Sequence, residues 1–258
     1  MGKYDIPATI DFILNLTNVK KLTYIGHSQG TTQLFAAMSN DIEYYNSKLN
    51  GFVALGPVTN LKYSSSWLIQ FAIYMKIDSL ASWLGVKEFL RGPEYQDSIV
   101  GVFCKYFSYL CDKVLGLIAD NHPEDDDMLK FEDYMDHFPS GTSIKSLQHF
   151  AQINRGGTFS NYDYGKDENK KKYGQATPPI YDVEKIKNIP ICMIYGDDDH
   201  LSGEKDNLWL KEKLEKNNAL YLFRQYNKMG HLTYFIPKEN RFLNDTLDCI
   251  RYFQQNKN

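Results

Sequence analysis

The sequence of 258 residues predicts an α/β fold in which helices flank a parallel β-sheet. Two patterns support this prediction. Short β-prone runs alternate along the chain with segments of helical spacing, as expected when helices connect the strands of a parallel sheet. Several of these runs are continuously apolar and bounded by glycine or proline, which is typical of strands buried on both faces. The hydrophobic content of 43% and the charged content of 24% are ordinary for a soluble globular protein.

The first predicted elements are two helices and two strands. Asp5 is a candidate N-cap for the first helix, and Asn18 is expected to end it. Residues 21–26, "KLTYIG", form a predicted strand, and residues 28–39 form a predicted helix with apolar side chains at helical spacing. Residues 49–58, "LNGFVALGPV", are predicted as a buried strand. A tight turn must therefore join the first strand to the helix that follows it.

The character of the sequence changes after the second predicted strand. Residues 61–138 lose the strand signals and contain aromatic stretches of helical type, so we interpret them as an insertion between two strands. The chain then divides into a core, residues 1–60 and 139–258, and a helical cap, residues 61–138. The later core elements are predicted as a helix at 140–155, a polar loop at 156–178, strands at 189–196 and 219–226, and helices at 204–216 and 244–255.

Charge and hydropathy argue against several classes of protein. The net charge of −3 indicates no nucleic-acid partner. No transmembrane helix is predicted, because the most apolar stretch, residues 67–75, is short and is interrupted by Gln70. No signal peptide opens the sequence, and no cysteines form a C-x-x-C pair. Neither a metal nor a cofactor is implied.

The cysteines and glycosylation sequons leave the compartment open. Cys104 and Cys111 are seven residues apart in the sequence and could share a helical face. A disulfide between them and free buried thiols remain alternatives. Two N-x-S/T sequons begin at Asn15 and Asn244. They are glycosylation sites if the protein is secreted or lysosomal, and chance occurrences otherwise.

The most informative stretch is Gly26-His27-Ser28-Gln29-Gly30, which has the pattern G-x-S-x-G. The pattern alone predicts only a turn, but here it lies between a predicted strand and a predicted helix. A nucleophile elbow needs such a turn, with glycines where a side chain would clash, so that the serine hydroxyl projects above the sheet. Ser28 is therefore a candidate nucleophile, and a structural glycine turn is the alternative.

A serine hydroxyl becomes an effective nucleophile only beside a base. Among the six histidines, His27 is expected to point away from Ser28, and His149 lies within a predicted helix. His231 lies in a loop after the last predicted strand and before the last helix. The chain order serine, acid, histidine places the base in such a loop. His231 is therefore the candidate base, and a purely structural histidine is the alternative.

The candidate acids are Asp197, Asp198 and Asp199, which follow the strand predicted at 189–196. Three adjacent carboxylates cannot all be buried in their ionised form. We expect one of them to turn inward toward His231 while the others stay in solvent, and spacing alone does not choose among the three. A solvated acidic turn is the alternative, whereas a cation site would need more ligands at defined intervals.

Several segments together resemble the animal acid lipase family, which includes lysosomal acid lipase and gastric lipase. The resemblance covers nearly the whole chain, and "GHSQGTT" and "FPSGTSIKSLQHFAQ" are far more specific than a bare G-x-S-x-G pattern. The other segments that carry it are "KYDIPATIDFIL", "YDYG", "PPIYDVEKI" and "HLTYF". The resemblance implies an α/β-hydrolase fold with a helical cap, and hydrolysis of neutral-lipid esters.

The resemblance also implies roles for individual residues. Ser28 matches the family's nucleophile, and His231 in "GHLTYF" matches its base. The acid of the family lies in a G-G-x-D-x-L motif, which selects Asp199 and leaves Asp197 in place of the second glycine. The backbone N–H of Gln29 would help to bind the oxyanion, with Gly26 and Gly30 as the glycines of the elbow.

A departure from the family concerns the N-terminal side. In the family, a signal peptide, early strands and an H-G-type loop with the second oxyanion donor precede the segment that matches "KYDIPATIDFIL". We therefore expect this chain to lack the N-terminal strands, to leave an open sheet edge beside residues 21–26, and to have weakened activity. The intact protein is expected to be lysosomal or secreted.

The leading hypothesis is a serine ester hydrolase that acts on triacylglycerols or steryl esters through an acyl-enzyme, with transient contact to lipid surfaces. The alternatives are a short-chain carboxylesterase, thioesterase or acyltransferase, and a catalytically silent fragment that binds lipid or a partner. The cap aromatics either line an acyl-chain tunnel or form the core of the cap. They are Trp67, Phe71, Tyr74, Trp83, Phe89, Phe103, Tyr106 and Phe107.

Overall fold

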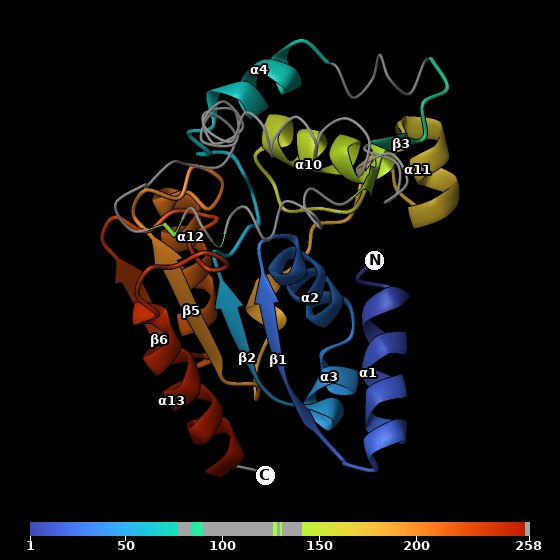
Figure 1. Ribbon diagram of the computed structural model, residues 1–258. Helices are drawn as coiled ribbons and strands as arrows, with labels where there is room; N and C mark the ends of the chain where they lie inside the picture. Colours follow the sequence, from blue (N-terminus) through green and yellow to red (C-terminus); the bar gives the residue numbers. More distant parts are fainter. Residues whose placement is uncertain (77–83, 90–125, 128–129, 131–140, 256–258) are drawn as a thin grey trace.

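The computed structural model describes residues 1–76, 84–89, 126–127, 130 and 141–255 (Figure 1). Four parallel strands form one sheet in the order β1-β2-β5-β6. They are β1 (Leu22–His27), β2 (Leu49–Leu55), β5 (Ile191–Gly196) and β6 (Leu220–Tyr226). All four arrows in Figure 1 point toward the side where α4 (Trp67–Tyr74) and α10 (Ile144–Gly156) lie. Loops that leave the carboxyl ends of the strands therefore meet on that side.

Alternate residues of the central strands enter two separate cores, one on each face of the sheet. In β2, Phe52 and Ala54 join the larger core, whereas Val53 and Leu55 join the smaller one. Such alternation follows from the period of two along a strand. The larger core packs against α1 (Asp5–Thr17), α2 (Gln29–Asn40), α3 (Ile42–Lys48) and α12 (Glu204–Glu215), and the smaller core against α13 (Arg241–Gln255). Helices thus cover both faces, as predicted.

α2 is buried along almost its whole length. Every residue from Thr31 to Ser39 is buried except Gln33. A helix that is buried on all sides belongs to the interior of a domain rather than to its surface. α2 therefore holds the turn that precedes it in a fixed position against the sheet.

α13 packs closely on β2 because Gly51 has no side chain. A Cβ at Gly51 would lie 2.3–2.6 Å from atoms of the Phe253 ring, so the ring occupies the space that a side chain would need. A disulfide between Cys192 of β5 and Cys249 of α13 joins the same two layers. The cysteines considered from the sequence, Cys104 and Cys111, lie outside the described residues.

Most predicted elements are confirmed, and the exceptions have local causes. Asn18 ends α1 in the left-handed conformation, at a φ of 52°. The N-cap predicted at Asp5 is wrong: Tyr4 is the N-cap, and the Asp5 carboxylate pairs with the terminal amine of Met1 at 3.3 Å. Asp5 is instead the first residue of the helix, where an acidic side chain is favoured by the helix dipole.

The loop predicted at 156–178 contains a helix, α11 (Lys166–Tyr173). This helix has no apolar stripe, so periodicity gives no signal for it. It is held instead by the buried amide of Asn169, which accepts from the Tyr164 N–H at 2.9 Å and donates to the Ala176 carbonyl at 3.0 Å. A short 3₁₀ turn, η2 (Val183–Lys185), follows before β5.

Most of the predicted cap lies outside the described residues, including Trp83, Phe103, Tyr106 and Phe107. In the part that is described, a two-residue strand β3 (Glu88–Phe89) pairs antiparallel with β4 (Thr142–Ser143). Phe71 and Tyr74 of α4 are exposed at 49% and 81%. These two side chains are therefore not part of a buried core. Among the described helices, none combines the length and apolar character that crossing a bilayer requires.

The disulfide gives a prediction for stability. Cys192 and Cys249 are 57 residues apart in sequence, so breaking their bond should lower the free energy of unfolding by about 2–4 kcal/mol. Denaturant titration with and without dithiothreitol would measure this change. The double variant Cys192→Ala/Cys249→Ala is the control, because it cannot lose this bond, so the difference between the two responses to the reductant measures the contribution of the bond. Equal responses of the two proteins would contradict the stabilising role of this bond.

Candidate active site

Ser28 lies in a strained turn between β1 and α2. Its φ of 53° and ψ of −120° are uncommon for a residue with a side chain. The turn is close because β1 has no side chain at Gly26, where a Cβ would lie 2.8 Å from Tyr24 and 3.0 Å from the Gly30 main chain. A Cβ at Gly30 would lie 3.7 Å from the Tyr24 hydroxyl, an ordinary contact distance, and this is its nearest neighbour outside α2. Only the first of the two elbow glycines is therefore required by close packing.

Hydrogen bonds fix this turn to the end of β2. The Ser28 N–H donates to the Leu55 carbonyl at 3.1 Å. The Thr31 hydroxyl donates to the Ser28 carbonyl at 2.6 Å and accepts from the Val58 N–H at 3.0 Å. Gln29 is the first residue of α2, and the first N–H groups of a helix have no partner within it. The Gln29 N–H therefore lies where developing negative charge is favoured.

Asp199 and His231 form a buried pair at the same edge of the sheet. The Nδ1 atom of His231 lies 2.7 Å from Oδ2 of Asp199, and both residues are buried. The other carboxylate oxygen, Oδ1, accepts from the N–H groups of Leu201 at 2.9 Å and Ser202 at 2.6 Å. Three donors thus surround one carboxylate, and a buried carboxylate requires such partners.

The three adjacent carboxylates lie in different environments. Asp197 is exposed, and its Oδ1 accepts from the Lys228 N–H at 2.7 Å. Asp198 is half-buried, whereas Asp199 is 4% exposed and is the one bonded to His231. One carboxylate turns inward, as expected, and it is the one that the family motif selects.

Two glycines permit the close approach of the segments around this pair, and of the two only Gly196, the first glycine of the family motif, belongs to a pattern identified in the sequence. A Cβ at Gly56 would lie 3.1 Å from Asp199 Oδ2 and 3.3 Å from His231 Nδ1, and Gly56 has a φ of 52°. A Cβ at Gly196 would lie 1.6 Å from the Met229 carbonyl oxygen, two residues before His231. In the sequence, Gly56 precedes Pro57 and Gly196 ends a predicted strand. Neither feature shows which distant segment packs against the glycine.

The residue that precedes Ser28 contacts His231 directly. His27 precedes Ser28, and its ring centroid lies 4.7 Å from that of His231. His149 lies elsewhere, on α10, where its Nε2 donates to the Ser160 carbonyl at 2.7 Å and burial lowers its pKa. His122 and His137 lie outside the described residues. The predicted nucleophile, acid and base thus gather at one edge of the sheet.

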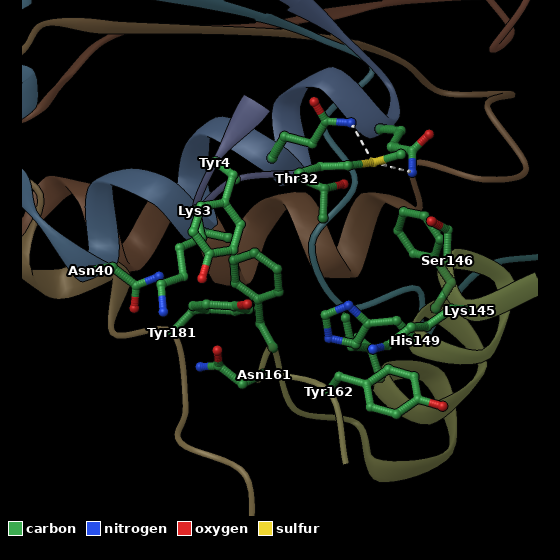
Figure 2. A pocket seen from close by; sticks show the side chains of 18 of the residues that line it. Lys3, Tyr4, Thr32, Asn40, Lys145, Ser146, His149, Asn161, Tyr162 and Tyr181 are labelled. Atoms are coloured by element: carbon green, nitrogen blue, oxygen red, sulfur yellow. Dashed lines mark hydrogen bonds between the residues drawn. The ribbon is translucent and has the colours of Figure 1, made fainter. Parts of the chain in front are cut away.

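A pocket of about 650 Å³ opens between α2 and α10. Its lining includes Gln29 and Thr32 of α2. Figure 2 shows Lys3, Tyr4 and Thr32 on one side of the pocket and Lys145 and His149 on the other. Gln29 belongs to the lining, whereas Ser28, Asp199 and His231 do not, so the pocket adjoins the nucleophile turn without containing the predicted triad.

Metal ligands do not gather at this site. Across the part of the chain that the structure describes, no group of three histidine, cysteine or carboxylate side chains could hold a metal ion.

Residues 1–237 match the family described as the alpha/beta hydrolase fold. The chain belongs to the α/β-hydrolase family. A soluble variant of monoglyceride lipase from Saccharomyces cerevisiae, solved with a substrate analogue, superposes with a TM-score of 0.51 at 13% identity. That alignment covers 99% of this chain and 68% of the yeast structure, and it supports the fold alone.

Curated relatives of this α/β-hydrolase include animal lipases. The chain is 37% identical to lipase lipl-3 of Caenorhabditis elegans over 80% of its own length and 52% of that protein. It is 34% identical to gastric triacylglycerol lipase of Rattus norvegicus over 86% of its own length and 55% of that protein. The resemblance to the acid lipase family is thereby confirmed. The chain spans about half the length of these relatives.

The close approach at Gly196 gives a prediction for the geometry of this α/β-hydrolase site. In Gly196→Ala, the new Cβ would displace the Met229 main chain and pull His231 away from Asp199. The low-field proton resonance of a buried imidazole–carboxylate hydrogen bond, assigned by its loss in His231→Gln, should disappear. Gly156→Ala is the matched control, since a Cβ there meets no atom within 4 Å. Persistence of the resonance in folded Gly196→Ala would contradict the prediction.

Proposed function

We propose that this chain carries the catalytic groups of a serine ester hydrolase that acts on neutral-lipid esters. Ser28 is the nucleophile, His231 the general base and Asp199 the residue that orients the base. The observation that carries the proposal is the buried 2.7 Å contact between Asp199 and His231 beside the strained turn of Ser28. A strained serine, an imidazole and a buried carboxylate in this chain order are the parts of a hydrolytic triad.

The chemistry follows from the hydrogen bonds of each group. Asp199 accepts the Nδ1 proton of His231, which leaves Nε2 as the basic atom of the ring. Nε2 removes the hydroxyl proton of Ser28 as its oxygen attacks the ester carbonyl, and the Gln29 N–H stabilises the oxyanion. The imidazolium then protonates the departing alcohol. Water, activated by the same imidazole, releases the carboxylic acid from the acyl-enzyme.

The substrate class rests on the relatives together with the pocket. The names of the curated relatives describe lipases, one of them a gastric triacylglycerol lipase. The pocket beside Gln29 is large enough for a substantial part of a lipid ester, at about 650 Å³. We therefore propose triacylglycerols or steryl esters as substrates, with transient contact between the enzyme and lipid surfaces.

The compartment and the domain division belong to the same proposal. The disulfide between Cys192 and Cys249 supports a lysosomal or secreted protein, because disulfides form and persist in oxidising compartments. Residues 1–60 and 139–258 supply the catalytic groups named above. We propose that residues 61–138 form a cap over the site, next to the carboxyl ends of the strands.

A fluorophosphonate probe tests the nucleophile directly. The probe should label the folded chain on one serine, and Ser28→Ala should remove the label, because Ser28 is the serine that we propose His231 to activate. Ser47→Ala is the matched control, since Ser47 is an exposed serine that donates to the Tyr44 carbonyl. Mass spectrometry of the labelled peptide identifies the site.

The same experiment separates the proposal from its alternatives. No label on well-folded protein would contradict the enzyme and favour a chain that binds lipid or a partner without catalysis. A label on another serine would contradict the assignment of Ser28. Labelling does not depend on the substrate, so the substrate class needs a second measurement.

A series of p-nitrophenyl esters tests the substrate class. If the acyl chain is buried, octanoate should be hydrolysed with a kcat/KM about 10-fold or more above that of butyrate, because each buried methylene contributes about 0.8 kcal/mol. Ser28→Ala gives the background for both esters. A preference for butyrate would contradict the lipase and favour a short-chain esterase, and hydrolysis of acyl thioesters alone would favour a thioesterase.

A further inference from the structure

His27 makes contacts that the proposed reaction does not use. It is the last residue of β1 and immediately precedes Ser28. Its Nε2 lies 2.9 Å from the main-chain carbonyl oxygen of His231. A carbonyl oxygen only accepts, so Nε2 must carry the proton and donate it. The bond joins two residues that are 204 positions apart in sequence.

The loop segment that follows His231 is anchored as well. The His27 ring lies 5.0 Å from the Tyr234 ring and 4.7 Å from the Phe235 ring, measured between centroids. The Tyr234 hydroxyl donates to the Ile194 carbonyl at 2.9 Å and accepts from the Gly56 N–H at 3.1 Å. The segment after His231 is thus tied to β5 and to the end of β2.

Two hydrogen bonds therefore hold His231 at different points. Asp199 holds the ring at Nδ1. His27 holds the main chain of the same residue, which fixes a second point. His27 is covalently joined to Ser28. Its hydrogen bond therefore holds the His231 main chain at a fixed position relative to the nucleophile.

The charge state of His27 suits this role. Burial, followed by the nearby charge of His231, lowers the pKa of His27 to about 3, although Asp199 acts in the opposite direction. His27 therefore stays neutral at ordinary pH and keeps one proton to donate. A charged His27 would oppose the formation of the imidazolium at His231.

We propose that His27 is a positioning residue, whose Nε2–H holds the main chain of His231 so that its imidazole stays aligned with Ser28. This inference rests on the proposed function, because alignment matters only if His231 acts on Ser28. The competing explanation is that His27 only fills space as an aromatic ring. The positioning role requires the Nε2–H donor of His27, whereas space filling requires only its ring.

Two substitutions separate these explanations. His27→Phe keeps a ring of similar size and removes the donor, whereas His27→Gln removes the ring and keeps an N–H donor at similar reach. We expect His27→Phe to lower kcat for p-nitrophenyl octanoate by about 10- to 100-fold with little change in KM, since loss of this part-buried hydrogen bond shifts the base. His27→Gln should restore most of kcat. If His27→Phe does not fold, His27→Met takes its place.

The outcomes decide the matter. Wild-type kcat in His27→Phe would overturn the proposal, and so would a His27→Gln variant as slow as His27→Phe. If wild-type protein is folded but reacts with no fluorophosphonate, the proposed function fails. The positioning role is then measured by the solvent exchange rate of the His231 Nδ1 proton. That exchange should be faster in His27→Phe than in wild type and His27→Gln, and equal rates in all three would overturn the proposal.

Discussion

The burial of the Asp199 carboxylate is the constraint on which this end of the molecule depends. A carboxylate in the interior needs hydrogen-bond donors on both oxygens, because water no longer supplies them. The chain after β5 therefore turns back so that the N–H groups of Leu201 and Ser202 reach Oδ1. The remaining oxygen requires a donor from elsewhere, and His231 supplies it. The loop after β6 is thus drawn to the loop after β5.

The parallel sheet makes this meeting possible across long distances in the sequence. Strands β1, β2, β5 and β6 all end at one edge, so the loops that carry Ser28, Gly56, Asp199 and His231 emerge together. Close approach then depends on missing side chains. Gly26 admits the turn into α2, Gly56 admits the acid–imidazole pair, and Gly196 admits the Met229 main chain. Of the three, only Gly56 leaves room that functional side chains occupy.

The sequence predicts the strand, turn and helix around Ser28 because the periodicity changes within a few residues. It also predicts His231 from chain order, and the family motif distinguishes Asp199 from its two neighbours. The structure was needed for contacts that leave no local pattern. The pairing of Cys192 with Cys249 depends on how α13 crosses β5, which spacing along the chain does not determine. His27 was expected only to point away from Ser28, and the partner it meets comes from a distant loop.

The conformation of Ser28 also sets the proposed catalytic role of this residue against the stability of the fold. A serine at a φ of 53° costs the folded state on the order of 1–3 kcal/mol, and a glycine at the same place would not. Thermodynamic stability alone would therefore favour replacing the hydroxyl-bearing residue at this turn. The strain at Ser28 destabilises the fold locally, and the burial of most of α2 compensates for it. Stability and reactivity are opposed at this one residue, so a chain of this fold selected only for robustness would be expected to lose its serine early.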